Sequence, residues 1–360
     1  MDVNLKGKNV LITGHTGFKG IWLSLLLREM GAIVSGYSLE PKQNPIYEAS
    51  HRSLFAHSWY EDIRERDKIK KAVLESQPDV IFHLSAQPLV LDSYNDPVYT
   101  FDVNVMGTAN LLEAMRGYSK KCAIVIITTD KVYDNREWDY PYRENDRLGG
   151  HDPYSTSKAC AELVIQSFRK SFFAPQKIKE HKIALASARA GNVIGGGDWS
   201  ANRIVPDIIR AFHENNILLI RNPEAVRPWQ HVLDALSGYL ILAGKLVEDP
   251  EDPYWHDAWN FGPSSEDNIA VKEIVSWAAE YWGNGKYEFA NSTKEFHEAS
   301  QLRLDCSKAT QHLGWKPVWQ ARQALSKTLE WYKKNLCNQE DPGAIALEQI
   351  RSYLSVANSL

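Results

Sequence analysis

The sequence predicts an α/β protein whose core is a doubly wound parallel sheet, followed by a smaller mixed α/β region. Two observations carry this prediction. Short apolar runs alternate with helix-length segments through the first half of the chain, and glycines and prolines break the second half into shorter pieces. Strands that alternate with helices need right-handed crossovers, which produce a parallel sheet covered on both faces.

Each element of the first half follows from its local pattern. Helical spacing of apolar residues, or a run closed by glycine, predicts helices, and short continuous apolar runs predict buried strands. The predicted strands are Lys8–Thr13, Ala32–Tyr37, Val80–Leu84, Ala123–Ile127 and Ile183–Ala188. The predicted helices are Ile21–Met30, Asp67–Gln77, Val103–Tyr118 and Pro153–Phe172, with a further one at Pro342–Val356 near the end of the chain.

Composition excludes several classes of protein. The net charge of −4 and pI of about 6.3 give no reason to expect nucleic-acid or membrane partners. No run approaches the roughly 18 apolar residues that cross a bilayer. The four cysteines are scattered without a CxxC pair, so we expect no metal site and no disulfide framework. Reduced thiols fit a cytoplasmic enzyme.

The glycine-rich turn after the first strand is the first specific signal. Gly14, Gly17 and Gly20 form a GxxGxxG pattern that opens the first helix. The first glycine permits the tight turn, the second lets the backbone approach a pyrophosphate, and the third allows close helix–strand packing. The helix N-terminus then favours phosphate. A plain tight turn is the alternative, but the position at the start of a βαβ pattern favours a Rossmann-type dinucleotide site.

A tyrosine and a lysine one helical turn apart are the second signal. Tyr154 and Lys158 form a YxxxK pair, and residues four apart share one helix face. We expect the ammonium to lower the pKa of the phenol, so that the phenolate can take a proton from a hydroxyl group. Thr129 ends the strand before this helix, and its hydroxyl is placed to orient the same substrate oxygen.

These motifs together resemble a known family. The ordered segments are GHTGFKG, HLSAQP, DVN, TTDKVY, YSTSK and RAGNVIGGGDW. They resemble the extended short-chain dehydrogenase/reductase superfamily, and within it the nucleotide-sugar 4,6-dehydratases, over about residues 8–335. Relatives that act on dTDP-glucose or GDP-mannose carry an acidic pair after the strand-end threonine. This chain has Asp130-Lys131 there, which resembles the dehydratases that act on CDP-glucose.

The resemblance implies a reaction with no net redox change. Bound NAD takes hydride from C4 of the hexose, water is lost across C5 and C6, and hydride returns to C6. Tyr154 is then the base at the C4 hydroxyl, and Asp130 the acid at the C6 oxygen. Lys131 stands where a glutamate normally removes the C5 proton. A lysine can do so only when neutral, so we expect burial and the charge of Lys158 to lower the pKa of Lys131. The alternatives are a positioning or electrostatic role for Lys131 and a structural cap at Asp130.

The resemblance also implies binding residues. Asp62 fits the place where this class presents an acid to the adenine amino group, and a loop acid is the alternative. Neither an acid nor an arginine ends the second strand, where Ser38 stands, so the choice of NAD over NADP rests on the resemblance. The cofactor-binding candidates are Gly14, His15, Thr16, Gly17, Phe18, Lys19, Gly20, Ser38, Asp62, Ile63, Leu84, Ala86, Tyr154 and Lys158. The substrate-binding candidates are Gln87, Asn192, Arg203, Arg227 and Arg303.

Several of these assignments have structural alternatives. Each arginine suits a diphosphate through its planar donor fork, but a surface salt bridge is as good an explanation for any one of them. Gln87 follows the HLSA strand, where a turn residue is equally plausible. His231 and Asp234 are expected to support the local fold rather than the chemistry.

The domain and assembly predictions complete this picture. Residues 1–191 are predicted as the NAD-binding domain, 192–337 as the nucleotide-sugar-binding region with some chain crossing back, and 338–360 as a helical tail. In relatives, helices equivalent to Val103–Tyr118 and Pro153–Phe172 pair between subunits, so we expect a homodimer or a higher homo-oligomer. The resemblance further implies deoxysugar supply for a bacterial lipopolysaccharide O-antigen.

Three functions stay open at this point. The first is a 4,6-dehydratase with CDP-glucose as substrate, and the second is another nucleotide-sugar dehydratase, a 4-epimerase or a simple dehydrogenase. Asp130-Lys131 argues against the epimerase, which lacks an acid and base pair there. The third is a non-catalytic dinucleotide-binding sensor, which the retained Tyr154 and Lys158 disfavour.

Overall fold

The central sheet of the molecule is parallel and doubly wound, as the sequence predicts. A computed structural model describes residues 3–264, 267–290 and 301–359. Its main sheet has seven strands in the order β11-β6-β5-β4-β1-β2-β3, and every neighbouring pair is parallel. The order reverses between β1 and β4, where open α/β sheets place their ligands.

The elements follow one another along the chain with these bounds. The strands are β1 (Asn9–Thr13), β2 (Ile33–Ser38), β3 (His57–Tyr60), β4 (Val80–His83), β5 (Cys122–Ile127), β6 (Ile183–Ala190), β7 (Val193–Ile194), β8 (Ile217–Ile220), β9 (Val226–Pro228), β10 (Gln230–His231), β11 (Ala258–Phe261), β12 (Asn268–Ala270) and β13 (Lys286–Phe289). The α-helices are α1 (Phe18–Glu29), α2 (Pro45–Leu54), α3 (Arg66–Ser76), α4 (Val90–Asn95), α5 (Pro97–Phe101), α6 (Gly107–Ala114), α7 (Pro153–Ser171), α8 (Ile178–His181), α9 (Ile204–His213), α10 (Val232–Glu248), α11 (Val271–Trp282), α12 (Ser307–His312), α13 (Ala321–Leu336) and α14 (Pro342–Ala357). A π-helix, η1 (Asp102–Met106), and two 3₁₀ turns, η2 (Asp130–Val132) and η3 (Pro175–Lys177), complete the elements.

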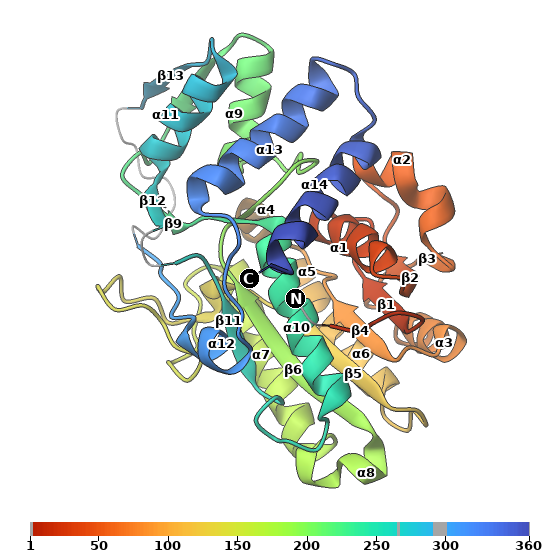
Figure 1. The fold of residues 1–360 in the computed structure, drawn as a ribbon. Helices are drawn as coiled ribbons and strands as arrows, with labels where there is room; N and C mark the ends of the chain where they lie inside the picture. The colour runs from red at the N-terminus through yellow and green to blue at the C-terminus, as the bar shows by residue number, and fades with distance from the viewer. Residues whose placement is uncertain (1–2, 265–266, 291–300, 360) are drawn as a thin grey trace.

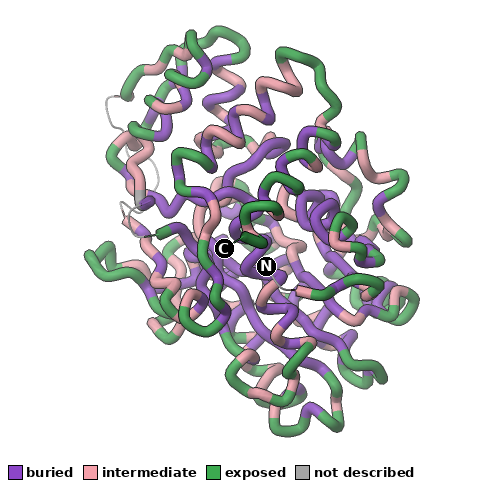
Figure 2. The backbone as a smooth tube through the Cα atoms, in the orientation of Figure 1, coloured by how far each residue is buried: buried purple, intermediate pink, exposed green. Residues whose placement is uncertain are grey.

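Both faces of the sheet are buried, because successive strand residues point to opposite sides. Val10 and Ile12 join one apolar cluster with α1 and α10, while Leu11 between them joins a second cluster with α3, α6 and α7. Figure 1 shows α10 and α1 crossing one face. The central strands β4, β5 and β6 are buried along their length, in the part of the molecule that is mostly purple in Figure 2. This burial explains why the strands read as continuous apolar runs.

The second half of the chain forms smaller units and also returns to the sheet. Three two-stranded sheets pair β10 with β7, β12 with β9 and β13 with β8. The helices α9, α11 and α13 pack on these strands and on one another (Figure 1). Between them, α10 packs on β5 and β6, and β11 extends the main sheet beside β6. The last helix, α14, packs against α1, α2 and α13.

The observed elements differ from the predicted ones in a few places. The helix predicted over residues 103–118 begins as the π-helix η1, an irregularity that apolar spacing does not reveal. The sheet gains two edge strands, β3 and β11, that the sequence analysis did not predict. In β3 every residue keeps some solvent exposure, so the short polar strand lacks the apolar run that marks the inner strands. None of the helices within the described ranges has the length and apolar character that crossing a membrane requires.

Candidate active site

The candidate residues gather where the central strands end. The glycine turn follows β1, Leu84 to Gln87 follow β4, Thr129 to Lys131 follow β5, and Asn192 follows β6. Because these strands are parallel neighbours, their carboxyl ends lie along one edge of the sheet. The sheet topology therefore brings together segments that are far apart in the sequence.

The glycine turn has the shape that a dinucleotide pyrophosphate requires. Gly14 has φ +79°, and a Cβ there would lie 2.8 Å from the Ser85 nitrogen, so only glycine fits. A Cβ on Gly20 would lie 2.1 Å from the Gly14 carbonyl oxygen. At Gly17 the nearest atom is 3.4 Å away, and this exposed residue precedes α1 without any side-chain cap. The helix N-terminus is thus open to an anion at the one glycine where space remains.

The side chains around this turn hold it against the second and third strands. The hydroxyl groups of Thr16 and Ser38 form a hydrogen bond of 2.8 Å. The His15 ring is buried under Gly36, and its Nε2 lies 2.6 Å from the Ser58 hydroxyl oxygen. Burial lowers the pKa of His15 to about 4, so the ring is neutral near pH 7. His15 therefore acts through packing, and its contact with a cofactor stays a prediction.

The candidates for the adenine side are also engaged within the protein. Both Asp62 oxygens accept hydrogen bonds from Arg64, which lowers the pKa of the Asp62 carboxyl. This pairing supports the alternative of a structural loop acid. Ile63 packs on Gly107, where a Cβ would lie 2.7 Å from its side chain. Leu84 and Ala86 are half-buried beside the turn, and their role stays a prediction.

Tyr154 lies at the start of α7 and is buried. Asp152 caps this helix by accepting a hydrogen bond from the Ser155 nitrogen at 2.9 Å. Burial raises the pKa of Tyr154 to about 12, although the Thr129 hydroxyl and the charge of Arg203 act to lower it. The expectation that Lys158 lowers the pKa of this phenol is therefore wrong for the protein alone. Burial dominates, and Lys158 Nζ donates to the Ile127 carbonyl at 3.2 Å.

Asp130 is a buried acid with free hydrogen-bonding capacity. Its Oδ1 accepts a hydrogen bond from the Thr129 hydroxyl at 3.0 Å, while its Oδ2 is buried with no partner in the described part of the chain. Burial raises the pKa of Asp130 against the opposing charges of Lys131, Arg227 and Lys19. A carboxyl group in this state is able to donate a proton.

Cations from distant segments converge on the same place. Burial, with the charges of Arg203 and Lys158, lowers the pKa of Lys19 to about 8. Burial also lowers the pKa of Lys158 to about 8. The charges of Arg203 and Arg227 reach Tyr154 and Asp130 respectively. The structure thus groups these predicted cations around the predicted acid and base, an arrangement that suits an anionic substrate.

The remaining substrate-binding candidates differ in the partners that they already have within the protein. Arg303 is half-buried, and its Nε has no hydrogen-bond partner among the described residues. Arg203 pairs with Asp198 at 2.9 Å. The Asn192 carbonyl accepts from the Gln230 nitrogen. The Gln87 amide bonds to Leu89 and to the Thr100 hydroxyl, which supports its alternative role as a turn residue.

Sequence reasoning missed several buried polar residues near this site. Asn104, inside the π-helix, donates to the Ser157 hydroxyl at 2.8 Å and to the Gln87 carbonyl. His83 joins Thr13 to Thr108, and burial lowers the pKa of His83 to about 3. Glu162 lies four residues after Lys158, and an acid repeating the helical spacing of the YxxxK pair is the signal that identifies it.

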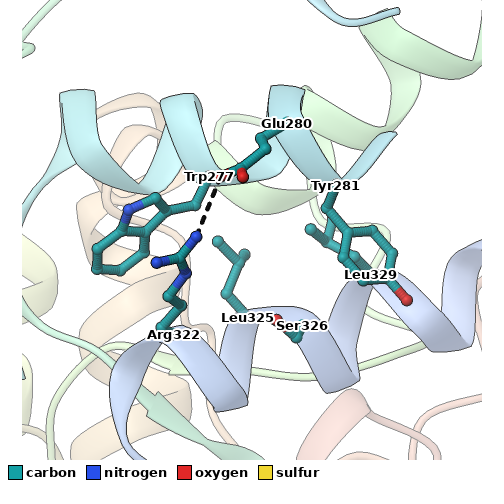
Figure 3. A pocket seen from close by; sticks show the side chains of 7 residues that line it. All are labelled: Trp277, Glu280, Tyr281, Arg322, Leu325, Ser326 and Leu329. Atoms are coloured by element: carbon teal, nitrogen blue, oxygen red, sulfur yellow. Dashed lines mark hydrogen bonds and ion pairs between the residues drawn. The ribbon is translucent and has the colours of Figure 1, made fainter. Parts of the chain in front are cut away.

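Hollows elsewhere in the molecule do not coincide with these residues. A cavity of about 240 Å³ lies between α11 and α13, where Glu280 and Arg322 form an ion pair at 3.1 Å (Figure 3). None of its lining residues is a predicted site residue. Within the ranges that the structure describes, no group of three or more His, Cys, Asp or Glu residues is arranged to hold a metal ion.

Comparisons with known proteins agree with this geometry. A family model described as GDP-mannose 4,6 dehydratase matches residues 11–328. The chain is 46% identical to a CDP-glucose 4,6-dehydratase of Salmonella typhimurium over 97% of both chains. It is 28% identical to a GDP-mannose 4,6-dehydratase of Yersinia enterocolitica over 86% of this chain and 90% of that one.

Solved structures share the fold at lower identity. A dTDP-glucose 4,6-dehydratase from Bacillus anthracis in complex with NAD superimposes with a TM-score of 0.75 at 20% identity, covering 91% of this chain and 97% of the other. A UDP-glucose 4-epimerase of Thermus thermophilus in complex with NAD gives 0.76 at 22% identity, covering 90% and 98%. The predicted Rossmann-type sheet is thereby confirmed.

Proposed function

Since this chain belongs to the GDP-mannose 4,6-dehydratase family, we propose that it is an NAD-dependent hydro-lyase that converts CDP-glucose to CDP-4-keto-6-deoxyglucose and water. The relative at 46% identity supports CDP-glucose as the substrate. The observation that carries the chemistry is Asp130, a buried carboxyl with one unpartnered oxygen, next to Thr129 and surrounded by cations.

The residues divide the reaction between them. The Tyr154 phenolate takes the proton of the C4 hydroxyl, with the Thr129 hydroxyl orienting the same oxygen. The resulting ketone acidifies the C5 hydrogen. Neutral Lys131 removes it as a proton, and the protonated amine gives a proton back to C5 when hydride is added to C6. Asp130, whose raised pKa keeps a proton available, donates it to the C6 hydroxyl as water departs.

The nucleotide diphosphate is assigned to the arginines. The segments that carry Arg227 and Arg303 lie side by side, because Val226 and Gln301 form a parallel β-bridge. The unpartnered Nε of Arg303 supports a role in holding an anion. Arg203 completes this positive side of the site.

NAD fits the turn after β1. The space at Gly17 and the open N-terminus of α1 support binding of a pyrophosphate there, and dehydratase and epimerase structures of the same fold hold NAD. When bound, NAD would supply the hydride acceptor for oxidation at C4 and the hydride donor for reduction at C6. Its positive charge would lower the pKa of a phenol beside it, which opposes the effect of burial on Tyr154. Lys158, on the face of Tyr154, is assigned to the nicotinamide ribose.

One assay tests the function. The purified protein is incubated with NAD and CDP-glucose, made alkaline, and read for the ultraviolet absorbance of a 4-keto-6-deoxy sugar. We expect a signal with CDP-glucose and none for the Tyr154→Phe variant. A signal only with dTDP-glucose, GDP-mannose or UDP-glucose would overturn the substrate, and net NADH accumulation by the wild type would indicate a simple dehydrogenase.

A homodimer in the cytoplasm is part of the proposal. Val98 on α5, Met106 on η1 and Leu163 on α7 are 77%, 51% and 55% exposed, and these helices pack beside one another. Such a group of exposed apolar side chains supports an interface between two copies of the chain. The four cysteines are free thiols, which supports a reducing compartment.

The Leu163→Arg variant tests the dimer. We expect light scattering after size exclusion to give a dimer for the wild type and a monomer for this variant, because a charge would be buried at the contact. Leu74→Arg is the matched control, since Leu74 is 54% exposed on α3. A monomeric wild type, or a dimer that survives Leu163→Arg, contradicts the assignment.

A further inference from the structure

An ion pair lies fully buried beneath the candidate active site. The Glu162 and Arg189 side chains are each 1% exposed, and they meet through two parallel hydrogen bonds of 3.0 Å. Two hydroxyl groups also donate hydrogen bonds to the Glu162 carboxylate, Thr128 at 2.6 Å and Ser187 at 2.9 Å. Glu162 thus has a fully satisfied carboxylate, and these partners hold its pKa below the usual range despite burial.

This pair is connected to both halves of the catalytic machinery. Glu162 lies four residues after Lys158 on the buried face of α7. Its partner Thr128 immediately precedes Thr129, Asp130 and Lys131. On the other side, Arg189 Nη1 donates to the Tyr133 hydroxyl at 2.9 Å, two residues after Lys131. The short segment after β5 is therefore held at both ends by one ion pair.

Stability alone is a poor reason for such an arrangement. Removing two charges from water costs several kcal/mol per ion, and well-packed apolar residues often stabilise a core equally well. The geometry that this pair imposes is specific, because two parallel hydrogen bonds fix both distance and orientation between α7 and β6.

We propose that Glu162 and Arg189 are a positioning pair, which fixes the phenol and ammonium of α7 against the acid and base that follow β5. The inference rests on the proposed function, since it names further residues that the same reaction needs. Because each side chain is only 1% exposed, neither is open to a substrate, and both act through Lys158 on one side and the segment from Thr129 to Lys131 on the other.

The negative charge of Glu162 has a second effect. Burial lowers the pKa of Lys158, and the charge of Glu162 opposes this. The other charged or titratable groups acting around Lys158 are His83 on β4, which burial keeps neutral, and Lys19 on α1, which repels it. Without Glu162 the ammonium loses its proton at lower pH.

The double variant Glu162→Gln/Arg189→Met tests the proposal without leaving a lone buried charge. Glutamine keeps an acceptor for Thr128 and a donor toward Ser187, so we expect this variant to fold. We expect kcat with CDP-glucose to fall about a hundredfold while KM changes less than about twofold, because positioning is lost and binding is not. The alkaline fall of the pH–rate profile moves to lower pH, since Lys158 loses its proton earlier.

Two further measurements keep the outcome decisive. Asp234→Asn removes another buried carboxyl, far from Lys158 in the sequence, and leaves kcat and the pH profile unchanged. Crystal structures of the wild type and the double variant, solved without substrate, show whether Lys158 Nζ and the segment after β5 shift relative to each other. A folded double variant with wild-type kcat and pH profile, or with an unshifted site, overturns the inference. A wild type inactive on every nucleotide sugar instead overturns the proposed function, and the crystal structures still decide the inference.

Discussion

Two regions of this molecule bury an aspartate in nearly the same way, and we propose a catalytic role for only one of the two. Asp130 lies in the turn η2 that follows β5, and Asp234 lies in α10 and contacts Tyr353 of the C-terminal helix α14. Both are buried, and both have an Oδ2 without a hydrogen-bond partner in the described chain. In both, burial raises the pKa of the carboxyl group.

The surroundings of the two carboxyls differ in charge. The charges acting on Asp130 include Lys131, Arg227 and Lys19, a set of cations that would attract an anion. Burial, with the charge of Asp267, raises the pKa of Asp234 to about 7, while hydrogen bonds from the Val318 and Trp319 nitrogens and the Tyr353 hydroxyl act to lower it. Burial, and an oxygen without a hydrogen-bond partner among the described residues, are common to both carboxyls. The cations that act on Asp130 are the difference, and they are the reason that we propose a catalytic role for Asp130 and not for Asp234.

Replacing Asp130 should give the largest difference in activity between the two buried aspartates. For Asp130→Asn we expect the dehydration rate to fall about a thousandfold, because the amide has no proton to give to the departing hydroxyl. C4 oxidation by Tyr154 continues, so NADH accumulates. The measurement is the alkaline absorbance of the product together with NADH absorbance.

The control for this prediction is Asp234→Asn, which keeps kcat within about twofold. Wild-type dehydration by Asp130→Asn would return this residue to the structural alternative of a cap.

Replacing Lys131 tests whether a cation beside Asp130 acts as a base or only through its charge. For Lys131→Ala we expect dehydration to fall about a hundredfold while slow C4 oxidation persists as NADH build-up. Lys131→Arg separates the two roles, because arginine keeps the charge but stays protonated. Activity in Lys131→Arg would assign an electrostatic role, and full turnover in Lys131→Ala would remove the residue from the mechanism.

The smallest effect is a pH dependence of stability from the Asp234 region. In the folded protein the pKa of Asp234 is about 7, while an unfolded carboxyl ionises near about pH 4. Between these values the folded state binds more protons, so this group lowers stability as pH rises through that window. The total is at most about 4 kcal/mol.

Thermal unfolding of wild type and Asp234→Asn measures this contribution. We expect the melting temperature of the wild type to fall relative to the variant between about pH 4 and pH 7. Parallel curves over that range would contradict the raised pKa. Tyr353→Phe, which removes the hydroxyl that donates to Asp234 at 2.9 Å, should raise the pKa of Asp234 further, so its cost of about 1 kcal/mol grows as the pH rises through the same window.

Much of the first half could be predicted because its signals are local. The glycine turn, the apolar strands and the four-residue spacing of Tyr154 and Lys158 each depend on neighbours in the sequence, and the structure forms them where expected. The sequence could not indicate that the His15 ring packs beneath Gly36, or that Arg64 forms an ion pair with Asp62. These outcomes depend on which segments fold against each other.

By itself the amino-acid sequence determined the five inner strands of the sheet, the turn after β1 and the candidates for the acid, the base and the cations, because periodicity and steric demands act over a few residues. Only the tertiary structure decided the protonation of these groups and their grouping. The pKa of Tyr154 is raised where a lowered value was expected. Arg203 and Arg227 follow β6 in the chain, and the fold brings their charges close enough to act on Tyr154 and Asp130 respectively. Burial and long-range charge depend on the packed fold, and no local pattern in the sequence records them.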